Sequence, residues 1–114
     1  MINLKPRKKQ WSKMGVDFLI SEYPNCLKFT RFVIDKKMRN LGFGTLFMNA
    51  LINYADFKNK RIDLRPDIAL GGSSLARLKK FYKRFGFIEN IGPDKIDISE
   101  TMYRHSKKMK WGKF

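Results

Sequence analysis

The sequence predicts a single α/β domain, and three features of the chain indicate it. An extended apolar run from Leu27 to Ile34 ends at a glycine-containing loop, and a segment with helical periodicity follows from about Gly44 to Lys58. A second strand pattern and a second helix pattern come next. Two short strand patterns then close the chain. Strand and helix patterns that alternate in this way are typical of an α/β fold.

The first half of the chain is expected to form a hairpin followed by a long helix. Residues 1–13 are a basic lead-in, and Met14 to Glu22 has the pattern of a strand. Tyr23-Pro24-Asn25 is a turn signal that brings the chain back antiparallel as the strand from Leu27 to Ile34. The helix that follows carries one face of residues at three-and-four spacing: Leu46, Phe47, Ala50, Leu51, Tyr54 and Lys58.

The second half repeats a strand and a helix and ends in a second hairpin. Arg61 to Pro66 alternates as a strand does, and Ser73 or Ser74 is expected to cap the next helix. Phe87–Ile91 and Ile96–Tyr103 are expected to pair as the closing hairpin. On the helix, four residues share an apolar face and five cations point mostly outward: Leu75, Leu78, Tyr82 and Phe85, and Arg77, Lys79, Lys80, Lys83 and Arg84.

Length and composition indicate one folded domain in a reducing compartment. The chain has 114 residues, of which 43% are hydrophobic, and its ten phenylalanines help to build a core. Cys26 is the single cysteine, so a cytoplasmic location without an internal disulfide is expected. No apolar run is long enough to span a membrane, and the basic N-terminus lacks the apolar core of a signal peptide. The domain is expected to cover residues 14–104, with a basic tail over 105–114.

The glycine-containing loop is the first candidate for a binding site. Its sequence, Arg39-Asn40-Leu41-Gly42-Phe43-Gly44, lies between a strand pattern and a helix pattern. Glycines let a ligand approach the main chain closely, and a helix start presents unpaired N–H groups and a partial positive charge. The junction can therefore seat a phosphate. A lone G-x-G also fits a plain tight loop, and on this motif alone the two interpretations stand level.

A family resemblance emerges when this loop is taken together with the end of the second helix pattern. An R-x-x-G-x-G after a strand, then a helix, a short strand and a second helix ending in Tyr82-x-x-x-Gly86-Phe87 resemble the GNAT superfamily of acyl-CoA N-acyltransferases. The match covers roughly Leu27 to Phe87. It implies a mixed, mainly antiparallel central sheet flanked by helices. The helices that usually precede the central strand in this family are missing here, so a partner, a second copy of the chain (a homodimer) or a large acceptor would complete the substrate side.

The resemblance implies that acetyl-CoA is the cofactor, and it assigns residues to hold it. The strand edge at Phe32, Val33 and Ile34 would pair with the amide groups of pantetheine. The Arg39 side chain would add charge or would brace the loop. Backbone N–H groups along one segment would take the pyrophosphate: Arg39, Asn40, Leu41, Gly42, Phe43, Gly44 and Thr45.

By the same resemblance, Tyr82 matches the position of the acid that protonates the departing thiolate. A phenol with a pKa of about 10 can donate to a thiolate whose conjugate acid has a pKa of about 8.5. Periodicity alone favours a core aromatic, because Tyr82 lies on the apolar face, and the surrounding motif favours the acid. No metal site is expected from a chain with one His and one Cys. A general base does not stand out. Some family members place a glutamate on the central strand, where this chain has Lys28, Thr30 and Arg31, and the residues that remain possible are Glu22, Asp63, Asp67 and His105.

The net charge of +15 is the second large signal in the sequence. The cations concentrate in the lead-in, on the second helix and in the tail, which favours a polyanionic partner or a merely soluble basic surface. Trp11 and Trp111, in the two basic termini, could stack on bases or pack on the domain.

Two functions follow from these features. The first is an N-acetyltransferase that moves an acetyl group from acetyl-CoA to a primary amine on a protein lysine, a protein N-terminus or an aminoacyl-tRNA. The second is a catalytically inactive binding module whose basic surface binds and inhibits nucleic acid or an acidic protein. The economy of the chain suggests a viral or mobile-element origin, in which case the location would be the host cytoplasm.

Overall fold

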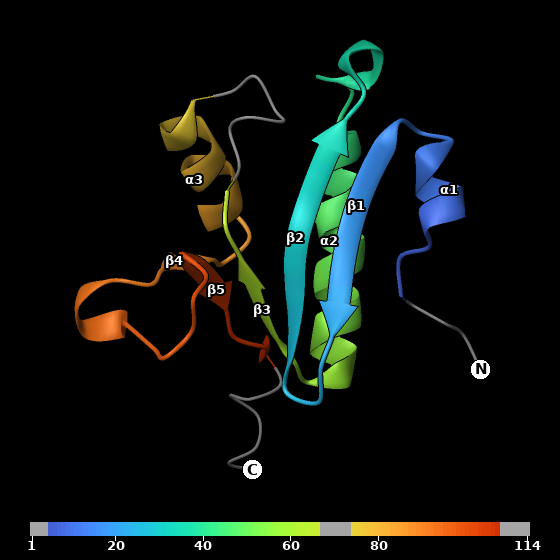
Figure 1. Ribbon diagram of the computed structural model, residues 1–114. Coiled ribbons are helices and arrows are strands. Elements are labelled where there is room, and N and C mark those ends of the chain that lie inside the picture. Colours follow the sequence, from blue (N-terminus) through green and yellow to red (C-terminus); the bar gives the residue numbers. More distant parts are fainter. Residues whose placement is uncertain (1–4, 67–73, 108–114) are drawn as a thin grey trace.

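The molecule is built on one five-stranded sheet in the order β1-β2-β3-β5-β4 (Figure 1). The computed structural model describes residues 5–66 and 74–107. Three strand pairs are antiparallel and the β2–β3 pair is parallel, so the predicted mixed, mainly antiparallel sheet is confirmed. The strands are β1 (Val16–Glu22), β2 (Cys26–Ile34), β3 (Arg61–Leu64), β4 (Ile88–Glu89) and β5 (Met102–Arg104), and the helices are α1 (Lys8–Ser12), α2 (Phe43–Lys58) and α3 (Leu75–Lys83).

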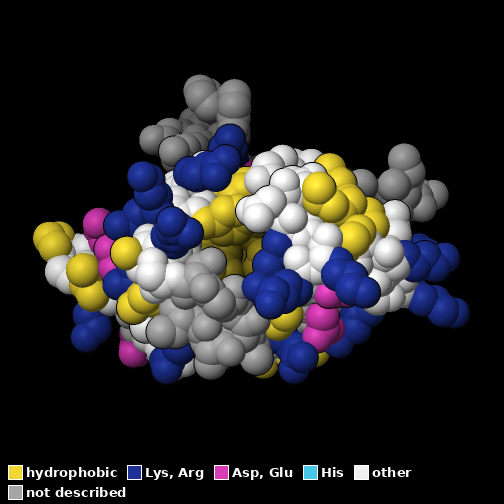
Figure 2. Space-filling view, turned by 90° about the horizontal axis from the view of Figure 1, so that it is seen from above, with side chains coloured by type: hydrophobic (Ala, Val, Ile, Leu, Met, Phe, Trp, Pro, Cys, Tyr) yellow, Lys and Arg dark blue, Asp and Glu magenta, His cyan; other side chains and the backbone are white. Residues whose placement is uncertain are grey.

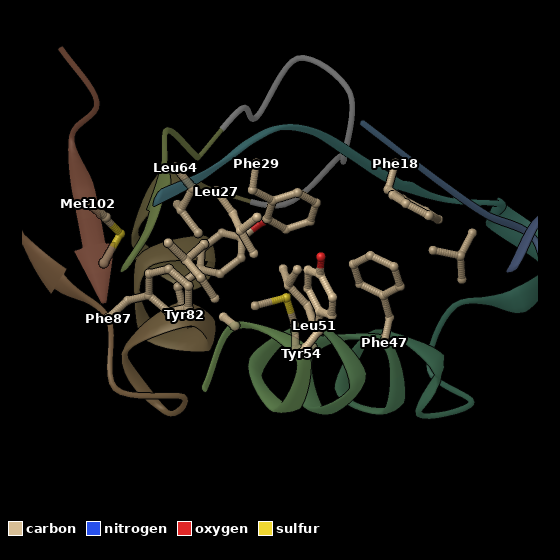
Figure 3. Packing of buried hydrophobic residues seen from close by; sticks show 14 of the residues in the cluster. Phe18, Leu27, Phe29, Phe47, Leu51, Tyr54, Leu64, Tyr82, Phe87 and Met102 are labelled. Atoms are coloured by element: carbon tan, nitrogen blue, oxygen red, sulfur yellow. The ribbon is translucent and has the colours of Figure 1, made fainter. Parts of the chain in front are cut away.

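The core lies between the sheet and α2, which crosses behind β1 and β2 in Figure 1. Alternate residues of the two strands, such as Phe18 and Phe29, face this helix and are buried. Phe47 on α2 meets both of them, with ring centroids 4.7 Å and 5.7 Å apart (Figure 3). The aromatic residues seen in the sequence therefore build the layer that fixes α2 against the sheet.

The parallel pair β2–β3 is short, and this shapes the rest of the molecule. The pairing runs from Cys26 with Arg61 to Phe29 with Leu64 and then stops. The remainder of β2, from Thr30 to Ile34, has only β1 as a strand partner among the described residues. α3 lies beyond the opening that results (Figure 1). The two central strands thus separate at one end of the sheet.

The lead-in contains a short helix, α1, that its composition did not indicate. Trp11 on this helix is buried, with 6% of its surface exposed, and its ring meets Phe47 edge-on at 5.0 Å. Of the two roles considered for Trp11, the structure shows packing on the domain. Trp111 lies outside the described residues.

The closing hairpin is shorter than predicted. β4 and β5 pair antiparallel, but the expected strand from Ile96 begins only at Met102. The side chain of Asn90 explains the difference, because its amide donates to the carbonyls of Ile98 (3.3 Å) and Glu100 (3.1 Å) while its oxygen accepts from Ile96 N–H (2.7 Å). These bonds replace a strand ladder and hold the segment as an irregular loop.

Candidate functional site

A cleft of about 470 Å³ opens where β2 separates from β3. Its walls are β2, the N-terminal end of α2 and α3. Figure 2 looks onto this end of the molecule and shows a hollow with a hydrophobic floor, bordered by Lys and Arg side chains. The floor includes Phe29, Leu64, Leu78 and Phe81. An apolar floor with a charged rim suits a ligand that has both an uncharged arm and anionic groups.

The first turn of α2 presents free backbone donors to this cleft. Gly42 precedes the helix with a left-handed φ of 85°, which glycine adopts without strain. Within the described residues, the N–H groups of Phe43, Gly44 and Thr45 have no acceptor, and Leu46 N–H is the first to bond, to the Gly42 carbonyl at 3.0 Å. The first turn holds no acidic residue. It is therefore open to an anion.

The structure brings most of the sequence-predicted coenzyme residues to one place. Arg39 also braces the loop, because its Nε donates to the Ile34 carbonyl at 3.0 Å. Val33, Leu41 and Phe43 are not among the lining residues of the cleft. The predicted residues that do line it are Phe32, Ile34, Arg39, Asn40, Gly42, Gly44 and Thr45.

Tyr82 belongs to both the core and the cleft. Only 5% of its surface is exposed, and its ring meets that of Phe87 at 5.8 Å (Figure 3). The ring of Phe81 lies 5.3 Å from it. It also lines the cleft, and its hydroxyl has no hydrogen-bond partner in the described part of the chain. Burial raises the pKa of Tyr82. The phenol is therefore protonated throughout the physiological range but donates less readily than an ordinary phenol, by about 1.4 kcal/mol for each pKa unit.

The carboxylates considered as general bases are engaged elsewhere. Asp63 is buried and accepts from Arg61 at 2.6 Å and 2.9 Å. Burial alone would raise the pKa of Glu22, but hydrogen bonds from Lys60, Tyr54 and Lys5 outweigh it and lower that pKa to about 2. Neither carboxylate lines the cleft.

The strand residues that stand where some family members place a glutamate, and the two remaining base candidates, offer no free base to the cleft among the described residues. Thr30 and Arg31 line the cleft, where the Thr30 hydroxyl donates to the Leu19 carbonyl at 3.4 Å. Arg31 Nε donates to a carboxylate oxygen of Asp17 at 2.6 Å. Lys28, from the same strand, pairs with Glu100 at 3.8 Å and is not a lining residue. Of the remaining base candidates, His105 packs on Tyr103 and is not a lining residue, and Asp67 lies outside the described residues.

The side chains that the sequence analysis missed are arginines. Arg77 and Arg84, expected to point away from the domain, line the cleft, and so does Arg65. Of the apolar face predicted for α3, Leu78, Tyr82 and Phe85 pack on the core and Leu75 is exposed, and Phe81 packs inward as well. Arg77 and Arg84 lie four residues before and three residues after Phe81, so they share its side of the helix and reach the cleft.

The lysines of α3 form a different surface. Lys79 and Lys83 each contact Glu89 at 2.9 Å, and these bonds lower the pKa of Glu89 to about 2. Two cations of the expected polyanion-binding face thus share one carboxylate, which offsets one of their two charges, while Lys80 is exposed. Among the described residues, no helix is long and apolar enough to cross a membrane.

Comparison with known proteins shows the fold. Ard1 from Thermoplasma volcanium has a similar structure, with a TM-score of 0.55 and 24% sequence identity over 81% of this chain and 63% of that chain. The fold is GNAT-like. A second structure, the KacTA–DNA complex, gives a TM-score of 0.47 and 16% identity over 84% of this chain and 58% of that one. This GNAT-like chain spans less than two thirds of the length of either neighbour. No protein-family model and no curated protein matches its sequence.

Proposed function

We propose that this protein binds acetyl-CoA in the cleft and transfers its acetyl group to a primary amine. One observation carries the proposal: the separated edge of β2 leads to a helix start whose first-turn N–H groups have no acceptor among the described residues. A long ligand with an amide-containing arm and an anionic end would satisfy both features. The GNAT-like fold and the R-x-x-G-x-G loop support the same ligand.

Different segments of the chain would bind different parts of the coenzyme. The β2 edge at Phe32, Val33 and Ile34 would pair with the pantetheine amides, as a neighbouring strand does. The segment from Arg39 to Thr45 would take the pyrophosphate through its amides and the helix dipole. Gly44 keeps this end open, since a Cβ there would lie 3.1 Å from Ile34 Cδ1. Acetyl-CoA would supply an activated thioester.

Tyr82 is our candidate for the acid that protonates the leaving sulfur. It reaches the cleft from the buried side of α3, and its hydroxyl proton is not committed to another described residue. Its raised pKa keeps that proton in place until acyl transfer leaves a thiolate beside it, and the proton would then pass to the sulfur at a cost that grows with the rise in the Tyr82 pKa.

The charge of the cleft narrows the range of amines that could accept the acetyl group. Five arginines and no Asp, Glu or His are among its described lining residues: Arg31, Arg39, Arg65, Arg77 and Arg84. This field disfavours a protonated amine and lowers the pKa of an amine that enters. An α-amine, with an ordinary pKa of about 7.7–8.0, would therefore need little help from a base. We propose an acceptor amine with anionic groups nearby, on a macromolecule such as an aminoacyl-tRNA or an acidic protein surface.

The proposal is tested in two steps on the full chain. Acetyl-CoA at 100 times its dissociation constant should stabilise the fold by about 2.7 kcal/mol in a thermal melt. Release of free coenzyme A is then followed with a thiol reagent in the presence of aminoacyl-tRNA, acidic peptides or polyamines. No thermal shift with millimolar acetyl-CoA would overturn the proposal.

A binding module that has lost catalysis is the second candidate. It is favoured by the absence of any carboxylate or imidazole among the described lining residues and by the raised pKa of Tyr82. For this candidate we expect a thermal shift with acetyl-CoA, or binding of nucleic acid, without coenzyme A release for any acceptor.

A further inference from the structure

The five arginines of the cleft differ in the ion pairs and hydrogen bonds that they already make. Arg31 is paired with Asp17, Arg39 donates to the Ile34 carbonyl, and Arg65 donates to the Ser99 carbonyl at 2.7 Å. The guanidinium groups of Arg77 and Arg84 have no carboxylate or carbonyl partner within the described residues. Both side chains are exposed and border the cleft. As far as residues 5–66 and 74–107 are concerned, the two guanidinium groups are therefore available to a ligand.

Arg77 and Arg84 lie on either side of the point at which α3 reaches the first turn of α2. Phe81 lies between the two on the same side of α3, four residues after Arg77 and three residues before Arg84. The Phe81 ring reaches the first turn of α2, since its Cζ would lie 3.5 Å from a Cβ built on Gly44. Each arginine is thus about one helical turn, roughly 5 Å along the axis, from this contact.

The two arginines provide more positive charge than a pyrophosphate at the helix start needs. That group would already have the amides of Phe43, Gly44 and Thr45 and the guanidinium of Arg39. The neighbouring Lys79 and Lys83 share the carboxylate of Glu89, but no described acidic residue pairs with Arg77 or Arg84. A guanidinium presents a planar fork of donors that matches a phosphate.

We infer that Arg77 and Arg84 bind the 3′-phosphate of the coenzyme and make the protein selective for CoA over its dephosphorylated form. A phosphate monoester carries a charge of about −1.5 to −2 at neutral pH, which two arginines balance. This inference rests on the proposed function, because it names two further contacts at the same site. It also separates the cations of α3 into a coenzyme pair, Arg77 and Arg84, and an outer pair, Lys79 and Lys83.

The test compares two ligands on five proteins. Acetyl-CoA and acetyl-3′-dephospho-CoA are titrated calorimetrically, at one ionic strength, into the wild type, the variant Arg77→Gln/Arg84→Gln and each single variant. The matched control is Lys80→Gln, which removes an exposed cation of the same helix that does not line the cleft. Melting without ligand shows that each variant is folded.

We expect the wild type to bind acetyl-CoA at least about tenfold more tightly than the dephosphorylated ligand. The double variant should lose this preference by binding acetyl-CoA more weakly, with its affinity for the dephosphorylated ligand unchanged. Lys80→Gln should keep the preference.

Three results would overturn the inference. Equal affinity of the wild type for the two ligands would remove the 3′-phosphate contact and leave the proposed function standing. An equal loss for both ligands in the double variant would assign the arginines to the pyrophosphate instead. A wild type that binds neither ligand would overturn the proposed function together with the inference.

Discussion

Gly44 and Phe81 meet where α2 begins and α3 passes: a Cβ atom on Gly44 would lie 3.5 Å from Cζ of Phe81. The same atom would lie 3.1 Å from Cδ1 of Ile34 at the end of β2. Three elements therefore converge on a residue that has no side chain. Their spacing sets how closely a ligand can approach the first-turn amides.

Replacing Gly44 with valine should remove the stabilisation by acetyl-CoA. The added methyl groups would occupy the space above the amides and press on Ile34 and Phe81, at a cost of about 1–3 kcal/mol in the free energy of unfolding. The measurement is the melting temperature with and without acetyl-CoA. Asn53→Val, on the exposed side of the same helix, is the control and should keep the full ligand shift. A full shift in Gly44→Val would contradict the site.

Tyr82→Phe should distinguish a role of Tyr82 as the acid from a role in packing alone. The hydroxyl has no hydrogen-bond partner in the described part of the chain, so its loss should change stability by no more than about 1 kcal/mol. Turnover should fall by about 10² or more, because the ring stays and the proton donor goes. Turnover is measured as coenzyme A release on an established acceptor. If the variant turns over at the wild-type rate, Tyr82 has a packing role alone.

Glu22 should make stability depend on pH in the acid range. Its carboxylate accepts from Lys60 Nζ at 2.7 Å and Tyr54 Oη at 2.7 Å, and its pKa in the folded protein is about 2 against an ordinary value of 4.5. A lowered pKa stabilises the fold above pH 4.5, and this contribution is lost as the pH falls from 4.5 to 2. It amounts to no more than about 3 kcal/mol.

Urea unfolding of the wild type and Glu22→Gln between pH 2 and pH 7 measures this contribution. The wild type should be the more stable at pH 7, and the two proteins should converge toward pH 2. A difference in unfolding free energy that does not change over this range would show that the carboxylate charge is not responsible.

Glu89→Gln should strengthen binding to a polyanion if the outer face of α3 takes part. The substitution frees Lys79 and Lys83 from their shared carboxylate. Each phosphate newly contacted should steepen the slope of log affinity against log salt by about 0.9 on duplex DNA, or about 0.7 on a single strand. Fluorescence anisotropy with labelled DNA and RNA over a salt series gives the slope. A slope shared by Glu89→Gln and the wild type would remove this face from any polyanion site.

The regular elements of the fold could be predicted from the sequence because their own residues determine them. β2 and α2 follow from β-branched and aromatic runs and from helical spacing, and Ser74 caps α3 as expected by accepting from Arg77 N–H. α1 could not be predicted, since its five residues are held by the contact of Trp11 with Phe47, far along the chain.

The candidate site could be predicted only in part for a similar reason. The segment from Arg39 to Thr45 is marked by its glycines, and its position before a helix is local information. The direction in which Arg77 and Arg84 point depends on which side of α3 packs inward, and Leu75 and Phe81 are both apolar. The packing of Phe81 toward Gly44 decides which side of α3 faces inward, and this contact cannot be predicted from the periodicity of α3 alone.

The separation of β2 from β3 gives the chain a modular character. Every described residue that lines the cleft falls between Phe29 and Arg84, so a single uninterrupted stretch of the polypeptide builds it. The β1 edge and the β4–β5 hairpin flank this unit without contributing to its lining. Substitutions in either flank therefore leave the lining residues of the cleft unchanged, so the flanks can be varied separately from the pocket that we propose for the donor.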